Sequence, residues 1–179
     1  MEIEKKYLVS RLPDDLNSYE HEEIEQAYLC DRPTLRIRRK GDRYIFTYKG
    51  RVMPVDADPG LTDSGPGDHG HESGSDQPDD RLCIADEVER PLTREAYEHL
   101  REKADGIIIT KTRYRIPYNG YTIELDLFHG EHEGFVLAEV EFPTAGEALS
   151  FNPPDWFGED VSGDVRYTNN YMSKKLLFS

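Results

Sequence analysis

The chain has 179 residues, a formal net charge of −14 and a pI near 4.8. This length suits one domain with a real hydrophobic core. The negative charge argues against a general binder of nucleic acid or of anionic membranes, since both require a basic face. A local basic pocket remains compatible with it.

The N-terminus has acidic residues where a signal peptide would have a basic and then an apolar region. No apolar run approaches the roughly 20 residues that a membrane-spanning helix needs. Cys30 and Cys83 form neither a zinc-binding pair nor a disulfide framework. We therefore expect a soluble, cytoplasmic protein with two free thiols.

Short runs of alternating apolar and polar residues predict about eight strands. The predicted strands cover 2–9, 25–30, 34–40, 43–49, 82–90, 107–118, 121–128 and 135–142. Gly41 and the Asn119-Gly120 pair mark two hairpin turns. Short connections imply antiparallel pairing, and eight antiparallel strands can close into a barrel, which removes exposed edges.

Three short helices are predicted beside the strands. Thr93 is a good N-cap and Gly106 a typical C-terminal residue, so a helix is expected between them. Further helices are expected over 144–149 and 168–177. His129 and His132, in a Gly- and Glu-rich turn, are expected at the surface.

The segment from about 51 to 81 differs from the rest of the chain. It is rich in Gly, Pro, Ser and Asp and has too few large apolar residues to offset the entropy of ordering it. We expect a flexible, solvent-exposed acidic insertion. His69 and His71 could bind a metal with their acidic neighbours, but without a rigid frame they are expected to be solvated.

Charged residues alternate with apolar ones in nearly every predicted strand, and within a strand they carry one sign. Because side chains two residues apart share a face, each strand presents a like-charged pair. The basic pairs are Arg36 with Arg38 and Lys111 with Arg113, with Lys49 alone on its strand; the acidic pairs are Glu2 with Glu4, Glu87 with Glu89, Glu124 with Asp126, and Glu139 with Glu141.

A face that met only water would mix the two signs, because like charges on neighbouring strands repel. Carboxylates hold divalent metal, and Arg and Lys hold phosphate, Arg by bidentate bonds. We infer that the charged faces line a wet enclosed bore for a metal–polyphosphate complex, with the apolar faces outward against helices. The alternative is a plain sandwich with a solvated charged face.

In their order along the chain, these pairs resemble the signature of the CYTH superfamily, the triphosphate tunnel metalloenzymes. Its Glu-x-Glu-x-Lys motif is matched by Glu2, Glu4 and Lys6, and the later basic and acidic pairs follow in the family's order. The segments 154–158 and 164–169 are similar to the C-terminal part of short prokaryotic members. The resemblance covers nearly the whole chain, 1–179, and the acidic insertion is its one departure.

The resemblance implies an α+β, mainly β fold: an eight-stranded antiparallel closed β-barrel, the triphosphate tunnel, with a few helices packed outside. It implies hydrolysis of inorganic tripolyphosphate or a nucleoside triphosphate with Mg²⁺ or Mn²⁺. The expected phosphate-binding residues are Lys6, Arg36, Arg38, Lys49, Lys111 and Arg113. The expected metal ligands are Glu2, Glu4, Glu124, Asp126, Glu139 and Glu141. The expected catalytic residues are Glu2, Glu4 and Lys6.

Four residues are weaker candidates: Glu87, Glu89, Arg166 and Lys174. Other functions stay open within the family, namely a class IV adenylyl cyclase and a thiamine triphosphatase. Outside enzymology, the chain could be a non-catalytic binder of polyphosphate or a nucleotide. The expected partner is a triphosphate-containing small molecule, with neither nucleic acid nor membrane, and the expected assembly is a monomer or a homodimer.

Overall fold

The structure is a computed structural model that describes residues 3–51 and 85–176. Three predictions concern residues outside these ranges. They are the ones made for Glu2, for Cys83 and for the insertion at about 51–81 with His69 and His71, of which only Arg51 is described. No helix of the described residues is long and apolar enough to cross a membrane.

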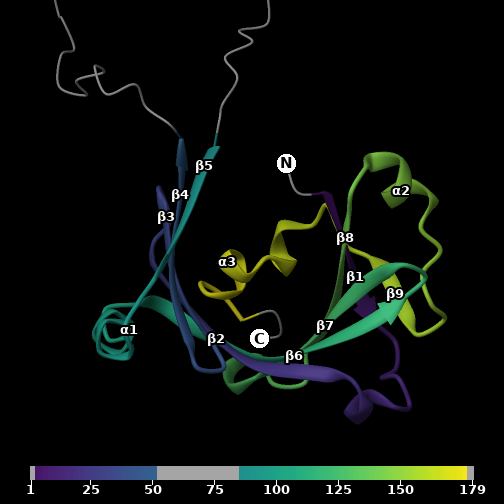
Figure 1. The fold of residues 1–179 in the computed structure, drawn as a ribbon, viewed down its shortest axis with the longest axis horizontal. Coiled ribbons are helices and arrows are strands. Elements are labelled where there is room, and N and C mark those ends of the chain that lie inside the picture. Colours follow the sequence, from purple (N-terminus) through teal and green to yellow (C-terminus); the bar gives the residue numbers. More distant parts are fainter. Residues whose placement is uncertain (1–2, 52–84, 177–179) are drawn as a thin grey trace, which may run out of the picture.

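In the part of the chain that the structure describes, nine strands form a single antiparallel sheet in the order β5-β4-β3-β2-β6-β7-β8-β1-β9 (Figure 1). Their bounds are β1 Ile3–Val9, β2 Glu20–Cys30, β3 Thr34–Lys40, β4 Arg43–Arg51, β5 Ala85–Pro91, β6 Asp105–Tyr118, β7 Tyr121–His129, β8 Val136–Phe142 and β9 Phe157–Asp160. The sheet curves so that β3, β4 and β5 form one wall and β8 and β1 the other.

This sheet differs from the closed eight-stranded barrel that we expected. The edge strands β5 and β9 are not paired with each other among the described residues, so the sheet is an open trough. Closure would bring the edges within about 5 Å of each other, but the C-terminal segment with α3 lies between the walls (Figure 1). The ninth strand, β9, pairs with β1 in a region predicted to be irregular.

Within 3–51 and 85–176, three α-helices and three 3₁₀ turns accompany the sheet: α1 Arg94–Arg101, α2 Ala145–Ser150, α3 Asn169–Met172, η1 Leu16–Ser18, η2 Gly130–His132 and η3 Val165–Tyr167. Thr93 caps α1 as predicted, accepting a hydrogen bond from the backbone N–H of Ala96 at 3.2 Å. The helix ends before Gly106, however, because β6 already begins at Asp105. The C-terminal helix is shorter than predicted, a single turn.

The apolar faces of the strands pack away from the charged ones, as predicted. On β7 and β8, Ile123 lies opposite Val140, and both are fully buried in a core that includes Trp156. A second cluster places Tyr97 of α1 against Ala27 and Ile37 on the outside of β2 and β3.

α3 does not follow the prediction that the helices lie outside. Its Met172 is fully buried against Ile109, Phe128 and Leu137. These three residues continue the charged faces of β6, β7 and β8 by the two-residue period. The charged face of the sheet therefore ends in an apolar patch, and α3 covers this patch inside the trough.

Two backbone contacts hold this segment in place. The Ser173 carbonyl accepts a 2.6 Å hydrogen bond from the Ile107 N–H. The Met172 carbonyl lies 2.9 Å from Nε2 of His132. His132 is only 5% exposed, so its predicted surface position is wrong, because the C-terminal segment covers it. His129 remains partly exposed.

Gly106 lies directly beneath Ser173, with a φ of +75°, and a Cβ at this position would clash with the Ser173 carbonyl oxygen. Gly106→Ala should therefore lower the free energy of unfolding by more than the roughly 1–2 kcal/mol of left-handed backbone strain. Gly120→Ala is the matched control, since Gly120 has a φ of +85° with nothing within 4 Å of its Cβ position. Urea unfolding measures both, and an equal loss would contradict the docking of α3 onto β6.

Candidate active site

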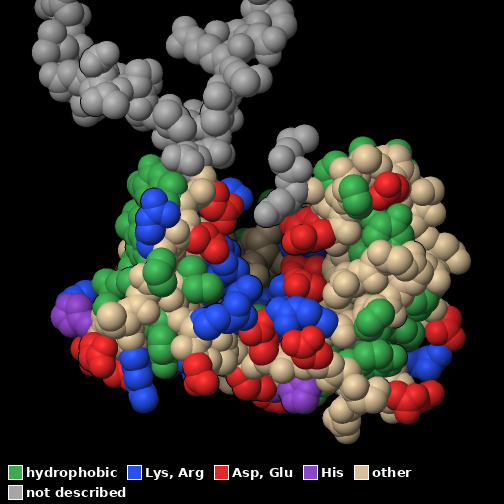
Figure 2. All heavy atoms as spheres, in the orientation of Figure 1, with side chains coloured by type: hydrophobic (Ala, Val, Ile, Leu, Met, Phe, Trp, Pro, Cys, Tyr) green, Lys and Arg blue, Asp and Glu red, His purple; other side chains and the backbone are tan. Residues whose placement is uncertain are grey.

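A cavity of about 330 Å³ occupies the trough between the two walls. Most of the predicted site residues line it, namely Glu4, Lys6, Arg36, Arg38, Lys49, Lys111, Arg113, Glu124, Glu139 and Glu141. The space-filling view shows basic and acidic side chains gathered in this hollow (Figure 2). The like-charged pairs of separate strands therefore converge on one cavity, and the alternative of a solvated outer face does not describe this fold.

Strand register brings carboxylates directly opposite one another. Glu4 of β1 faces Glu141 of β8, and Glu124 of β7 faces Glu139 of β8. Like charges at directly opposed positions destabilise a sheet unless cations balance them. The same four carboxylates line an adjoining hollow of about 290 Å³, so the cavity has an acidic end.

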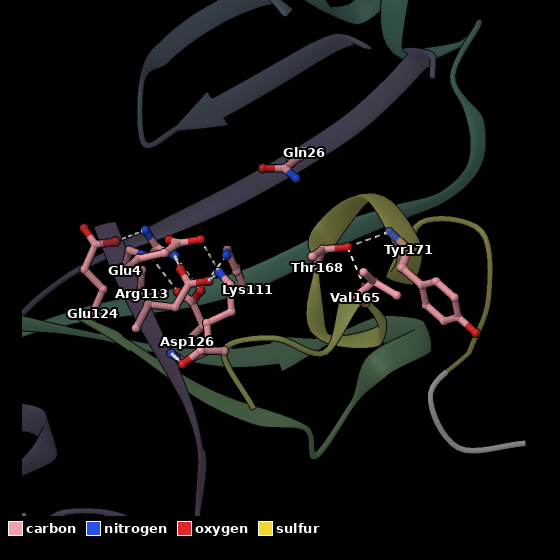
Figure 3. Close-up of polar contacts among 12 residues, drawn as sticks. Glu4, Gln26, Lys111, Arg113, Glu124, Asp126, Val165, Thr168 and Tyr171 are labelled. Atoms are coloured by element: carbon pink, nitrogen blue, oxygen red, sulfur yellow. Dashed lines mark hydrogen bonds and ion pairs between the residues drawn. The ribbon is translucent and has the colours of Figure 1, made fainter. Parts of the chain in front are cut away.

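Basic side chains balance part of this charge within the protein. Lys6 forms ion pairs with Glu139 and, at 3.0 Å, with Glu4. Arg113 bonds Glu139 at 2.8 Å and also bonds Glu124 (Figure 3). Acidic and basic side chains of the consecutive strands β6, β7, β8 and β1 thus neutralise each other.

Asp126 and Lys111 form the base of this network. The Lys111 ammonium lies 2.5 Å from an Asp126 oxygen, and Arg113 adds two hydrogen bonds of 2.6 Å to the same carboxylate (Figure 3). Asp126 is fully buried and Lys111 nearly so. Burial lowers the pKa of Lys111, with Asp126 opposing the shift. Asp126 therefore lies beneath the cavity and orients its cations.

Glu139 has the most strongly shifted carboxyl of the site. Burial alone would raise its pKa, but the charges of Lys111, Lys6 and Arg113 outweigh burial and lower the pKa to about 2. In turn, Glu139 and Glu4 raise the pKa of Lys6 against the effect of burial. Glu139 and Lys6 therefore stay charged at neutral pH.

Arg36 and Arg38 form the opposite, basic end. Arg38 is paired with Glu89, and Arg36 lies 3.6 Å from Glu87. The Nε atoms of both arginines are nonetheless buried without a hydrogen-bond partner among the described residues. A buried donor left unpaired is costly, and these two N–H groups are free to donate to an acceptor.

Lys49 is exposed and pairs with Glu87 at 3.2 Å. Glu87 and Glu89 contact the arginines but do not line the cavity. Arg166 pairs with Asp164 on the exposed η3 turn, and Lys174 pairs with Asp31 at 2.5 Å. The structure does not bring Arg166 or Lys174 to the cavity.

Sequence reasoning missed several lining residues. Lys40 continues the alternation of Arg36 and Arg38, so the two-residue period could have identified it. The neutral lining residues carried no such signal, because uncharged side chains do not stand out on a strand. They are Ile24, Gln26 and Tyr28 from β2 and Thr168, Asn169 and Asn170 beside and within α3.

The chain is similar to proteins named as inorganic triphosphatases. One from Nitrosomonas europaea is 31% identical over 181 residues, covering 98% of this chain and 98% of that protein. One from Acetivibrio thermocellus is 43% identical over 90 residues, covering 49% of this chain and 54% of that protein. Among solved structures, a crystal structure of an inorganic triphosphatase superposes with a TM-score of 0.67 at 29% identity, covering 98% of this chain and 95% of that one.

No family model matches the chain. The full-length similarity to an inorganic triphosphatase agrees with the ordered charged pairs and with their convergence in one trough. The chain belongs to the family of these inorganic triphosphatases, the CYTH superfamily of triphosphate tunnel proteins.

Proposed function

We propose that this chain hydrolyses inorganic tripolyphosphate to pyrophosphate and orthophosphate, with nucleoside triphosphates as the second candidate substrate. The observation that carries the proposal is the pair of unpaired Nε donors of Arg36 and Arg38, buried in a cavity whose other end is lined by carboxylates. A polyanion can take the donors while a cation takes the carboxylates. The names of the relatives favour the inorganic substrate.

The basic residues would bind the phosphate chain. Arg36 and Arg38 offer planar guanidinium groups suited to bidentate bonds with phosphoryl oxygens. Lys6 and Arg113 lie at the junction with the acidic end, each held by Glu139. Because these cations are already oriented by carboxylates, they would stabilise the charge that builds up on the leaving pyrophosphate without first reorganising.

The acidic end fits the Mg²⁺ or Mn²⁺ that the proposal includes. Glu4, Glu124 and Glu141 line both hollows, and carboxylate oxygens are the ligands these hard cations prefer. Among the described residues, no three acidic, His or Cys side chains already form a metal-binding group. Lys6 pairs with Glu4 and Arg113 with Glu124. When bound, a divalent cation would neutralise phosphate charge and acidify the attacking water.

The sequence predicts Asp126 and Glu139 as metal ligands, but this proposal gives them another role. Both are engaged by buried cations, so we assign them to positioning Lys6, Lys111 and Arg113. Glu2 lies outside the described residues, so its role as a metal ligand stays a prediction.

Adenylyl cyclase activity is the main rival reaction, since a ribose hydroxyl would then replace water as nucleophile. Among the residues that the structure describes, Tyr28 is the one aromatic side chain of the cavity lining on which a base could stack. Incubation with ATP and either Mg²⁺ or Mn²⁺ separates the two. Phosphate release supports the hydrolase, and cyclic AMP would contradict it. Tight binding with no turnover of any triphosphate would identify a non-catalytic binder.

Glu4→Gln should lower kcat for tripolyphosphate by about 100-fold, the upper range for a disturbed metal site, because it removes a carboxylate charge while keeping the side-chain shape. The activity should recover in part at higher Mg²⁺ concentration. Phosphate release across a Mg²⁺ titration measures both effects. Glu159→Gln, at an exposed position of β9, is the control, and equal activity of the two variants would contradict the assignment of Glu4.

Glu139→Gln should change how stability depends on pH. The folded pKa of Glu139 is about 2, below its ordinary value of 4.5. Its ion pairs therefore stabilise the protein fully above about pH 5, and this contribution is lost as the pH falls towards 2. Urea unfolding should give wild type a much higher free energy of unfolding than the variant at pH 6, with a clearly smaller difference at pH 3.

Glu102→Gln, on an exposed position after α1, controls for the general loss of negative charge. Its stability difference from wild type should stay small over the same pH range. A constant gap between wild type and Glu139→Gln from pH 6 to pH 3 would contradict the role given to the Glu139 ion pairs.

A further inference from the structure

One cation of the cavity differs from all the others. The basic residues that line it are Lys6, Arg36, Arg38, Lys40, Lys49, Lys111 and Arg113. Each except Lys40 forms an ion pair with a carboxylate. Within residues 3–51 and 85–176, Lys40 makes neither an ion pair nor a side-chain hydrogen bond.

The neighbouring strand explains why Lys40 has no counter-ion. Lys40, the last residue of β3, lies opposite Ile24 of β2, which in turn lies opposite Lys111 of β6. All three side chains line the cavity. Across the sheet from Lys40, the first neighbour is therefore the apolar Ile24 and the second is another cation, Lys111. No carboxylate comes from β2 at this level.

The nearest acidic side chains are engaged elsewhere. Glu22 and Glu124 act on Lys40 only from a distance. Glu22 bonds Arg115 and lies 3.4 Å from Arg43, and Glu124 bonds Arg113. Burial and the charges of Arg38 and Arg113 lower the pKa of Lys40. A half-buried ammonium without a partner is costly, and a bound anion would remove this cost.

We propose that Lys40 is a substrate-binding residue whose ammonium takes a phosphoryl oxygen at the end of the cavity where Arg113 and Glu124 meet. This inference rests on the proposed function. The other cavity cations already have a carboxylate partner, whereas Lys40 would gain a partner without losing one. The contribution of Lys40 to the affinity for the triphosphate is therefore large for a single lysine.

The test compares Lys40→Gln with Arg39→Gln. Arg39 is the adjacent residue of the same strand and lies on the opposite face, in a separate hollow beneath Tyr97. Both variants remove one positive charge. Calorimetry with tripolyphosphate in the absence of divalent cations should give a dissociation constant about tenfold weaker for Lys40→Gln and within about twofold of wild type for Arg39→Gln. Lys40→Arg, which keeps the charge, should bind nearly as wild type does.

Stability without ligand gives a second readout. Because Lys40→Gln removes an unpaired charge, its midpoint of urea unfolding should equal or exceed that of wild type, while the shift of thermal midpoint on adding tripolyphosphate should shrink. A marked loss of stability in the free variant would overturn the premise that Lys40 is unpaired.

The outcomes distinguish the two proposals. If wild type neither binds nor hydrolyses tripolyphosphate, the proposed function fails and the Lys40 inference fails with it. If wild type binds and Lys40→Gln matches Arg39→Gln, only the assignment of Lys40 is overturned. A selective loss in Lys40→Gln that Lys40→Arg restores supports the assignment.

Discussion

The trough depends on one constraint: like-charged side chains lie directly opposite each other on neighbouring strands. Glu4 faces Glu141 and Glu124 faces Glu139 across antiparallel ladders, an arrangement that a sheet tolerates only where cations intervene. In the free protein these cations are the ammonium of Lys6 and the guanidinium of Arg113. The acidic and basic strands consequently hold each other in register and in charge balance.

This balance also prepares the site for its substrate. A buried salt bridge is weak evidence for stability, because desolvation offsets much of the attraction between the charges. Here the ion pairs surround a cavity that also contains unpaired buried donors from Arg36 and Arg38. A triphosphate with its divalent cation carries both signs of charge, as the internal pairs do. The internal pairs thus orient the groups that the complex would meet.

Much of this could be predicted from the two-residue period of strands. The period places Arg36 and Arg38 on one face of β3, and Glu139 and Glu141 on one face of β8, whatever the tertiary fold. The like sign of the charges within each pair led to the prediction that the pairs converge on one cavity, which all four residues line. The start of β2 was harder to predict. The first part of β2 is charged on both faces, since Glu20 and Glu22 alternate with His21 and Glu23, and no amphipathic signal marks it as a strand.

The position of α3 could not be predicted from its own residues. Met172 is its one buried side chain, and it is held in the trough by distant partners, His132 and Ile109. The same contact buries a histidine that looks like a surface residue in a Gly- and Glu-rich turn. The unpaired state of Lys40 likewise depends on strand register, because only the pairing of β3 with β2 shows that Ile24 lies beside it.

The most direct test of the account is a crystal structure of the Glu4→Gln variant with tripolyphosphate bound. We expect the anion in the trough, with phosphoryl oxygens accepting hydrogen bonds from the Nε atoms of Arg36 and Arg38. A structure in which the anion binds elsewhere, and these two buried donors stay unpaired at saturating tripolyphosphate, would contradict it.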